Sequence, residues 1–433
     1  MNFQEAQDYL FSLGNEVSAM KLGLDSVDLL LDSLGNPQTS YLKVQVAGTN
    51  GKGSVCAFLD SICSRAGIDT GVYTSPHLVS ITERIRVLGA EIAENDFARL
   101  STKVRAVSES LTATGRLEAV PTYFEQVTAI ALLAFAEAKV ELAILETGLG
   151  GRLDATTAAR AEVAAITRID LDHQRYLGET LKEIAAEKAA IIHPESKVVA
   201  LRQSRVVDAV IEGRCREVGV EPAWATQDIS ILREPVIHPR LVANFRTERA
   251  TYRRVLLWDM LGEHQVENAA IAIGLAELLQ DAGFKMERKA VEIGLETAGH
   301  PGRLEWIGRF LLDGAHNLGG AKALGAYLDA AVNDPAAIIF AAMDDKNVAE
   351  ITSELFPRTH AVVLTRPDNS RAMTPEQLLE LVPIEIRDRP IHLTETVAEA
   401  IEKAVEISGN GAVVITGSLY LVGEAKRILE SET

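Results

Sequence analysis

Short apolar runs alternate with amphipathic stretches along most of the chain. Candidate strands, rich in β-branched and other apolar residues, fall at residues 43–47, 142–146, 163–167 and 197–201. Stretches with a helical spacing of apolar positions lie between them, at residues 53–66, 123–138 and 180–192. Near-continuous apolar strands separated by helices are typical of a parallel sheet covered on both faces. The first part of the chain is therefore predicted to be an α/β domain.

This alternation is interrupted between residues 220 and 260. The segment is rich in Arg, Glu, Val and Ile and contains Pro222, Pro235 and Pro239. Prolines are confined to edge strands and turns, so the segment predicts a small antiparallel insertion or a set of edge strands. A helix is predicted to follow over residues 264–281.

A second alternating series begins after the Gly- and Pro-containing stretch at residues 297–302. Its candidate strands are residues 309–313, 337–342, 361–365 and 412–416, and its helices include residues 319–331 and 397–407. Glycine and proline interrupt regular structure, so we predict a domain boundary there. The expected domains are residues 1–298 and 299–433.

Length and charge limit the classes of function. A chain of 433 residues suits two domains, and an apolar fraction of 47% allows large cores. The 43 basic and 61 acidic residues give a net charge of −18. Nucleic-acid binding needs a basic face, so this balance argues against it, although a local site can still bind a small anion.

The cysteines and the N-terminus bear on location. Three cysteines without CxxC spacing argue against a disulfide framework or a structural zinc site and favour a reducing compartment. Residues 1–14 have the pattern of a helix start and lack the basic region and apolar core of a signal peptide. No apolar run reaches the roughly 18 residues that a membrane span requires. We expect a cytoplasmic protein with no membrane partner.

The strongest local motif is a glycine-rich turn between a buried strand and a helix. Its residues are Gly48, Thr49, Asn50, Gly51, Lys52, Gly53 and Ser54. Glycines let backbone N–H groups converge on phosphate oxygens, a lysine can reach the β- and γ-phosphates, and a serine can hold magnesium. Gly53 separates the lysine from the serine, unlike in the common P-loop pattern. The alternative interpretation is a glycine-rich turn with a solvated lysine.

Two acidic motifs follow apolar strands. Glu146 ends the strand at residues 142–146, where open α/β sheets bind ligands, and its carboxylate suits magnesium. The alternative is a surface acid at a strand end. Asp172-His173 follows the strand at residues 163–167. His173 is a candidate metal ligand, although a lone histidine is more often a structural hydrogen-bonding group.

Lys188 falls on an apolar helix face. Helical spacing places it with Ile184, Ala185, Ile191 and Ile192. A charged amine is costly there, so Lys188 would be neutral, paired or modified, and a neutral amine can add carbon dioxide to form a carbamate. Spacing alone favours a lysine whose ammonium extends to solvent.

With these motifs the chain resembles the folylpolyglutamate synthases and bifunctional dihydrofolate synthases of the Mur ligase superfamily, from about residue 20 to about residue 425. Further matching segments are residues 73–78, 82–85, 122–125, 146–156, 264–269, 301–303, 313–317, 343–346 and 416–420. Thr157 stands where the family usually has Asn, and we assign it no role. The resemblance implies an α/β fold: an N-terminal P-loop-type parallel-sheet ATPase domain, the Mur-ligase-type central domain, and a C-terminal Rossmann-like glutamate-ligase domain.

The resemblance also implies roles for individual residues. It gives catalytic roles to Lys52, Lys188 and His316, and metal ligation to Ser54, Ser75, Glu146, His173 and a carbamate on Lys188. ATP would contact residues 48–54 together with Asn268, Arg303 and Asp313. The pterin or folate would contact Thr122, Tyr123, Phe124, Leu153, Asp154 and Ala155. Glutamate would contact His316 and Ser418.

The implied activity is ATP-dependent addition of L-glutamate to a folate, and also to dihydropteroate, through an acyl phosphate. The expected cofactors are ATP and magnesium at two sites, the partners are small molecules, and the protein is expected to be a monomer. One alternative is another Mur-type amide ligase, although no third alternating domain precedes residue 40 to bind a UDP-sugar. Another is a nucleotide-gated binding module without ligase activity.

Overall fold

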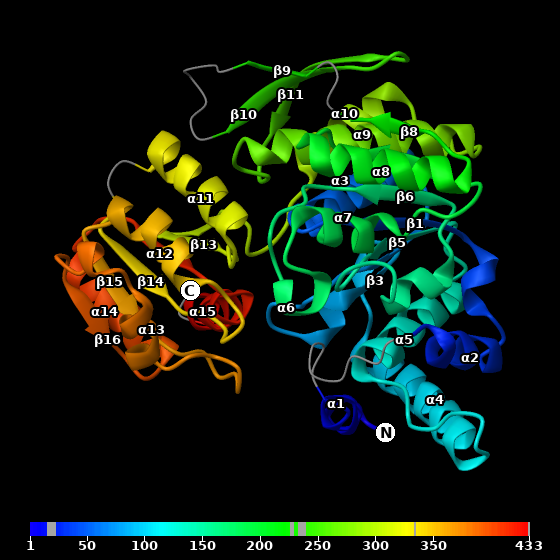
Figure 1. Ribbon diagram of the computed structural model, residues 1–433, viewed down its shortest axis with the longest axis horizontal. Coiled ribbons are helices and arrows are strands. Elements are labelled where there is room, and N and C mark those ends of the chain that lie inside the picture. The colour runs from blue at the N-terminus through cyan, green and yellow to red at the C-terminus, as the bar shows by residue number, and fades with distance from the viewer. Residues whose placement is uncertain (15–22, 226–228, 233–239, 333–334, 432–433) are drawn as a thin grey trace.

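Two α/β sheets, one on each side of residue 300, organise the chain (Figure 1). The computed structural model describes residues 1–14, 23–225, 229–232, 240–332 and 335–431. None of the helices in these ranges is long and apolar enough to cross a membrane.

The first sheet has eight strands in the order β4-β3-β2-β5-β1-β6-β7-β8. Their bounds are β1 Leu42–Ala47, β2 Thr70–Tyr73, β3 Ile85–Val87, β4 Ala90–Glu91, β5 Leu142–Glu146, β6 Val163–Ile166, β7 Lys197–Ala200 and β8 Pro222–Trp224. Only β3 and β4, at one edge, pair antiparallel. β1 lies between β5 and β6, with Val46 opposite Glu146 and Ala165. The loop after β1 and the carboxylate ending β5 therefore meet at one edge of the sheet.

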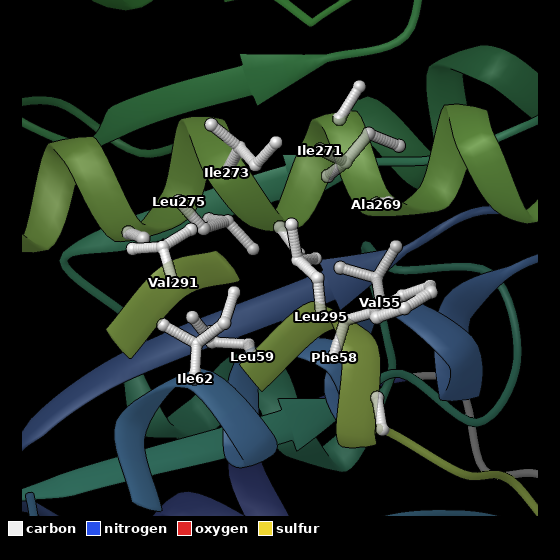
Figure 2. Close-up of a cluster of buried hydrophobic side chains, with 14 of the residues drawn as sticks. Val55, Phe58, Leu59, Ile62, Ala269, Ile271, Ile273, Leu275, Val291 and Leu295 are labelled. Atoms are coloured by element: carbon white, nitrogen blue, oxygen red, sulfur yellow. The ribbon is translucent and has the colours of Figure 1, made fainter. Parts of the chain in front are cut away.

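Helices cover both faces of this sheet, as the apolar strands predict. Val44 and Val46 point toward α3 Lys52–Ala66, α9 His264–Asp281 and α10 Arg288–Thr297. Figure 2 shows Phe58 and Ile62 of α3 packed against α9 and α10. The other face is covered by α1 Phe3–Ser12, α2 Asp25–Ser33, α4 Glu94–Ala113, α5 Tyr123–Ala138, α6 Gln174–Leu177, α7 Leu181–Ala189 and α8 Arg205–Val218.

After β8, an edge strand of the first sheet, the described part of the interruption forms a separate three-stranded antiparallel sheet, as predicted. Its strands are β9 Ile229–Leu232, β10 Leu241–Arg246 and β11 Thr251–Leu257. Phe245, Tyr252 and Val255 join the core beneath α9 and α10. The small sheet thus extends the first core.

The second large sheet has six strands in the order β12-β13-β17-β14-β15-β16, and only β12 is antiparallel. The strands are β12 Glu305–Ile307, β13 Phe310–Asp313, β14 Ala337–Phe340, β15 Ala361–Leu364, β16 Ile391–Leu393 and β17 Val413–Thr416. Its helices are α11 Leu318–Ala331, α12 Val348–Leu355, α13 Pro375–Leu381, α14 Val397–Ser408 and α15 Leu419–Ser431. Short 3₁₀ turns elsewhere are Pro37–Ser40, Ile81–Arg84, Ala155–Ala159, Phe356–Arg358 and Ile384–Ile386.

Most predicted elements are confirmed to within two residues, but the helix predicted over residues 180–192 is wrong at its end. α7 ends at Ala189, and Ile191 and Ile192 lie in the turn that follows. Both isoleucines are buried, so the apolar pattern continues past the helix. Apolar spacing reports burial, and here it does not separate a helix from a buried turn.

Gly294 marks the closest approach of α10 to α3. A Cβ atom at Gly294 would lie 2.5 Å from the Cα and 2.7 Å from the backbone N of Ile62. We expect Gly294→Ala to lower the free energy of unfolding by about 1–3 kcal/mol in urea titrations, because backbone atoms cannot yield as a side chain can. The control is Gly213→Ala in α8, where no atom lies within 4 Å of the added Cβ. Equal stability of the two variants would contradict this packing.

Candidate active site

One cavity of about 570 Å³ lies between the two sheets and is lined by both halves of the chain. All the site residues predicted from the sequence line it except Tyr123. Tyr123 is buried, with its ring stacked on Phe11 at 5.9 Å between centroids and the Arg84 guanidinium 5.5 Å away. The predicted folate contact of Tyr123 has no support here, because its ring joins the core while Thr122 and Phe124 reach the cavity.

The glycine-rich loop is fixed by the segment after β6. The backbone N–H groups of Thr49 and Asn50 both donate to the carbonyl oxygen of Arg168, at 2.7 and 3.1 Å. A Cβ atom at Gly48 would lie 1.8 Å from Oγ1 of Thr167. Gly51 has a φ of 89°, and a Cβ there would lie 2.3 Å from Oδ1 of Asn268. Only glycine fits at these two positions, so the backbone of the loop lines the cavity.

The loop leads into the N-terminus of α3. No side chain caps this helix, so its first-turn N–H groups are available to an anion in the cavity. Nζ of Lys52 donates to the carbonyl oxygens of Gly48 and Thr49 at 3.1 and 3.2 Å. The Ser54 hydroxyl accepts from Nε2 of Gln265 at 3.2 Å. The lysine therefore lies over the loop, as phosphate binding requires.

Glu146 is a buried carboxylate beside this loop, so the surface-acid alternative is wrong. Only 6% of it is exposed, and Oε2 accepts from the backbone N–H of Ser75 at 3.1 Å. Burial raises the pKa of Glu146, opposed by the charge of Lys52, the Ser75 N–H and Arg303. A Cβ at Gly53 would lie 3.5 Å from Glu146 Oε2, so carboxylate and loop are adjacent. A carboxylate with serine hydroxyls nearby fits magnesium, which prefers hard oxygen ligands.

Lys188 does not extend to solvent, so the arrangement favoured by spacing is wrong. It is 4% exposed, and Nζ donates to the carbonyl oxygen of Gly48 at 2.8 Å. Burial, reinforced by the charge of Lys52, lowers the pKa of Lys188 to about 7. A large fraction of this amine is therefore neutral near neutral pH, the form that adds carbon dioxide.

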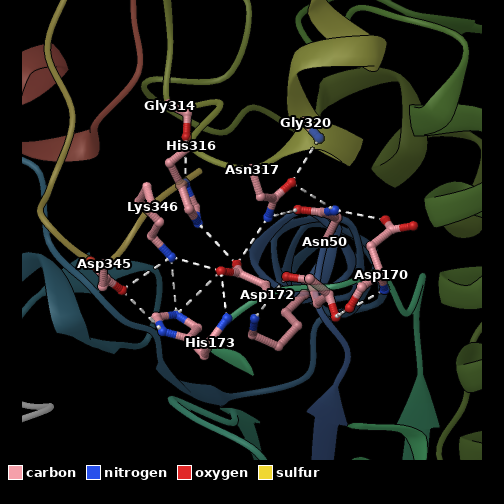
Figure 3. Close-up of polar contacts among 12 residues, drawn as sticks. Asn50, Asp170, Asp172, His173, Gly314, His316, Asn317, Gly320, Asp345 and Lys346 are labelled. Atoms are coloured by element: carbon pink, nitrogen blue, oxygen red, sulfur yellow. Dashed lines mark hydrogen bonds and ion pairs between the residues drawn. The ribbon is translucent and has the colours of Figure 1, made fainter. Parts of the chain in front are cut away.

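Asp172 is the centre of a polar network that joins the two halves of the chain (Figure 3). Its carboxylate accepts from Nζ of Lys346 at 2.7 Å and from Nδ2 of Asn317 at 3.0 Å, and Nε2 of His316 lies 3.6 Å away. Burial acts to raise the pKa of Asp172, but His316, Lys346 and His173 hold it well below its usual range. Asp172 is therefore an anion at neutral pH.

His173 adjoins this network. Its Nδ1 lies 3.5 Å from Oδ2 of Asp345, and its Nε2 lies 3.5 Å from Nζ of Lys346. In the part of the chain described, no cluster of three or more His, Cys, Asp or Glu side chains is arranged to hold a metal. A metal at His173 would therefore need other donors, such as phosphate oxygens or a carbamate.

Among the predicted folate residues, Phe124, Leu153 and Ala155 give the cavity apolar surface beside the polar Thr122 and Asp154. The ring of Phe124 packs against Gly148, where a Cβ would lie 2.5 Å from Cζ. Asp154 is buried and accepts from the N–H groups of Leu149 and Thr156, at 2.9 and 3.0 Å. Asp154 thus holds the loop that presents Leu153 and Ala155 to the cavity.

The second half of the chain contributes charged residues along the opposite wall. Asp313, at the end of β13, accepts from the N–H groups of Leu304 and Ala315, each at 2.9 Å. Burial raises the pKa of Asp313, opposed by Arg303. Ser418 lies near the start of α15 with 2% exposure, while on the first-domain side Nδ2 of Asn268 in α9 donates to Gln265 at 2.9 Å.

Several residues that line the cavity were not predicted from the sequence to have a role. They are His264, Gln265, His300, Lys322, Lys346, Arg371 and Asp172. Asp172 and Lys346 both stand inside matched motifs, Asp172 next to the chosen His173, and membership of a motif is the signal that could have identified them. His300 lines the cavity so near Gly53 that a Cβ there would lie 2.5 Å from its Nε2.

Comparisons with known proteins agree with this geometry. The family model for the Mur ligase middle domain matches residues 46–276, and that for the dihydrofolate synthetase C-terminal domain matches residues 305–428. The chain belongs to the dihydrofolate synthase/folylpolyglutamate synthase family of the Mur ligase superfamily. The resemblance seen in the motifs is thereby confirmed.

Several relatives align along the whole chain. It is 32% identical to the dihydrofolate synthase/folylpolyglutamate synthase of Bacillus subtilis, covering 99% of both proteins. It is 33% identical to a probable bifunctional folylpolyglutamate synthase/dihydropteroate synthase of Haloferax volcanii, and 98% of this chain spans only 50% of that protein. The Halobacterium salinarum relative is likewise covered over about half its length, 51%.

Solved structures support the two-domain α/β fold. The Mycobacterium tuberculosis folylpolyglutamate synthase complexed with ADP and AMPPCP has a TM-score of 0.90 at 30% identity, covering 99% of this chain and 98% of that one. Escherichia coli FolC in complex with DHPP and ADP has a TM-score of 0.87 at 28% identity, covering 100% and 98%.

The burial of Lys188 predicts a pH-dependent stability difference. The pKa of Lys188 is about 7 in the folded protein, below the ordinary lysine value that applies to the unfolded chain. Between pH 7 and 9 the unfolded chain therefore binds a proton that the folded protein has lost, so the free energy of unfolding rises with pH. In buffer free of carbon dioxide, we expect the wild-type protein to gain about 2–3 kcal/mol relative to Lys188→Met across this interval. Denaturant titrations at each pH measure the difference. Lys182→Met, at an exposed position of the same helix, should keep the wild-type slope; equal slopes for all three would contradict the neutral lysine.

Proposed function

We propose that this chain is an ATP-dependent ligase that adds L-glutamate to a folate, and also to dihydropteroate, through an acyl phosphate. The main supporting observation is that one cavity is lined by a glycine-rich anion loop, a buried carboxylate, apolar side chains and charged residues of the second half of the chain. A ligase needs these parts together because it must bring a nucleotide, a carboxylate and an amine into line.

The proposed domains are residues 1–298, a P-loop-type ATPase of the Mur ligase central type, and residues 299–433, a Rossmann-like glutamate-ligase domain. The strand orders support this division, because no strand of one large sheet pairs with the other among the described residues. The cavity lies where the two domains meet, so their relative position would decide whether it is complete.

ATP would bind along residues 48–54, with Asn268 at the nucleoside and Arg303 and Asp313 at the domain seam. The uncapped N-terminus of α3 and the ammonium of Lys52 supply the positive charge that a triphosphate requires. Ser54, Ser75 and Glu146 would hold magnesium, which when bound would neutralise triphosphate charge and polarise the transferring phosphoryl group.

A second magnesium site would use His173 and a carbamate on Lys188. Neutral Nζ would add to carbon dioxide and lose a proton, which converts a buried amine into an anionic oxygen donor. The lowered pKa of Lys188 and its position against the carbonyl of Gly48 support this modification. The chemistry of the donor set, imidazole nitrogen and carboxylate-like oxygen, fits a divalent cation.

The proposed reaction has two steps. The carboxylate of the folate or dihydropteroate would attack the γ-phosphorus of ATP, so that an acyl–phosphate bond forms as the bond to ADP breaks. The neutral amine of glutamate would then attack the acyl carbon, and inorganic phosphate would leave as the amide forms and the amine releases a proton. Lys52 and Arg303 would offset the charge on the transferring group. A closed seam would keep water from the acyl phosphate.

The two ends of the cavity would bind different substrates. Thr122, Phe124, Leu153, Asp154 and Ala155 line the part of the cavity that would take the pterin, a flat heteroaromatic ring with apolar faces and polar edges. His316 and Ser418 line the wall of the second domain, where glutamate would enter. We also propose that the substrates are small molecules, that the protein is a monomer and that it is cytoplasmic. Its three cysteines are free and buried, which suits a reducing compartment.

A substrate comparison tests the proposal. We expect ATP turnover to ADP and phosphate by the purified protein to depend on L-glutamate together with either dihydropteroate or tetrahydrofolate. Coupled phosphate release measures this, and mass spectrometry of the pterin product should show one added glutamyl group. ATP turnover without dependence on glutamate would instead support the nucleotide-gated binding module, and turnover with neither pterin substrate would favour another Mur-type ligase.

Lys52 provides the sharpest single-residue test. Lys52→Ala removes the ammonium that lies over the loop, and we expect kcat for phosphate release to fall about 10²-fold or more, as on loss of a transition-state donor. Lys182→Ala, an exposed lysine on α7, serves as the control and should keep full activity. Near-normal turnover by Lys52→Ala, with the protein folded, would reject the assigned role.

A further inference from the structure

The loop at residues 75–80 belongs to the first domain but packs into the second. Leu78, in this loop, packs against a core cluster of the second domain that includes residues of β13, β17 and α15. A Cβ at Gly302 would lie 2.9 Å from Cδ1 of Leu78 and 3.2 Å from Cγ1 of Val422. The Leu78 side chain is therefore seated between the start of the second domain and its last helix.

The backbone of the same residue touches α15. A Cβ at Gly423 would lie 2.0 Å from the carbonyl oxygen of Leu78 and 2.7 Å from its carbonyl carbon. Any side chain at position 423 would force helix and loop apart, because the contact is with backbone. α15 lies on the side of the second domain that faces the first (Figure 1).

The loop itself is held rigid. The carboxylate of Glu83 accepts from the backbone N–H groups of Leu78, Val79 and Ser80, at 2.8, 2.8 and 2.6 Å. Nε of Arg84 donates to Nδ1 of His77 at 2.7 Å. A displacement of Leu78 would therefore move the loop as a unit.

The other end of the loop is at the candidate magnesium site. Ser75, three residues before Leu78, donates its backbone N–H to Oε2 of Glu146 at 3.1 Å. Ser75 and Glu146 are two of the three ligands proposed for the first magnesium, the third being Ser54. A chain of contacts thus connects α15, which follows Ser418, through Leu78 and its loop to the proposed metal ligands.

We propose that Leu78 is a positioning residue that couples the placement of the second domain to the geometry of Ser75 and Glu146. The packing of Leu78 between Gly302 and Gly423 fixes the position of the loop. The loop in turn fixes the position of Ser75 relative to Glu146. The proposal rests on the proposed ligase function for its purpose. The coupling itself can be measured without catalysis.

The test uses the steric fit at Gly423. Gly423→Ala should weaken binding of Mn²⁺, measured by electron paramagnetic resonance with a non-hydrolysable ATP analogue, by about tenfold, because disturbing the groups that orient metal ligands typically costs about 10- to 100-fold in affinity. The kcat for glutamate-dependent ADP release should fall by at least as much, measured below the unfolding midpoint of the variant, which the clash itself lowers. The control Gly213→Ala, a helical glycine with open space around it, should change neither.

A second variant decides the outcome if Gly423→Ala does not fold. Leu78→Ala removes the seated side chain without a clash, and Mn²⁺ affinity should again fall, by about threefold or more. Wild-type Mn²⁺ affinity in a folded variant of either kind would overturn the proposal. Wild-type protein that binds Mn²⁺ and the analogue but releases no ADP with glutamate would instead refute the ligase function and leave the coupling intact.

Discussion

The site depends on the close approach of the loop after β1 to the segment after β6. Two adjacent N–H groups, those of Thr49 and Asn50, share the carbonyl oxygen of Arg168. Gly48 fits against Thr167 only because it lacks a Cβ. This contact fixes the uncapped N-terminus of α3, and the carbonyl of Gly48 in turn accepts from Lys52 and Lys188. The glycines here serve close packing as much as backbone freedom.

Buried charges connect the two domains. Asp172, in the first domain, takes its partners Lys346, His316 and Asn317 from the second. Removing one partner of a buried pair typically costs about 3–5 kcal/mol, because a charge remains without compensation. The relative position of the domains and the charge balance of the cavity are therefore linked. The seating of Leu78 is a second, apolar contact across the same seam.

Sequence patterns predicted much of this architecture. Near-continuous apolar runs located β1, β5, β6 and β7 to within a residue or two. The rule for open α/β sheets placed the glycine-rich loop and Glu146 at the same sheet edge. Motif resemblance added the residues of the second domain, which no local pattern connects to the first. Asp172 and Lys346 were not predicted as site residues because they are 174 residues apart, and the ion pair that joins them forms only in the folded protein.

The sequence by itself determined which segments are strands and helices, where the anion loop lies and which family the chain resembles. These follow from spacing, glycine placement and ordered motifs, all of which are local. Only the tertiary structure decided that Lys188 turns inward to Gly48, that Tyr123 leaves the cavity for the core, and that Leu78 enters the second domain. The reason is physical: periodicity fixes the face on which a side chain lies, while burial and partners depend on what distant segment covers that face.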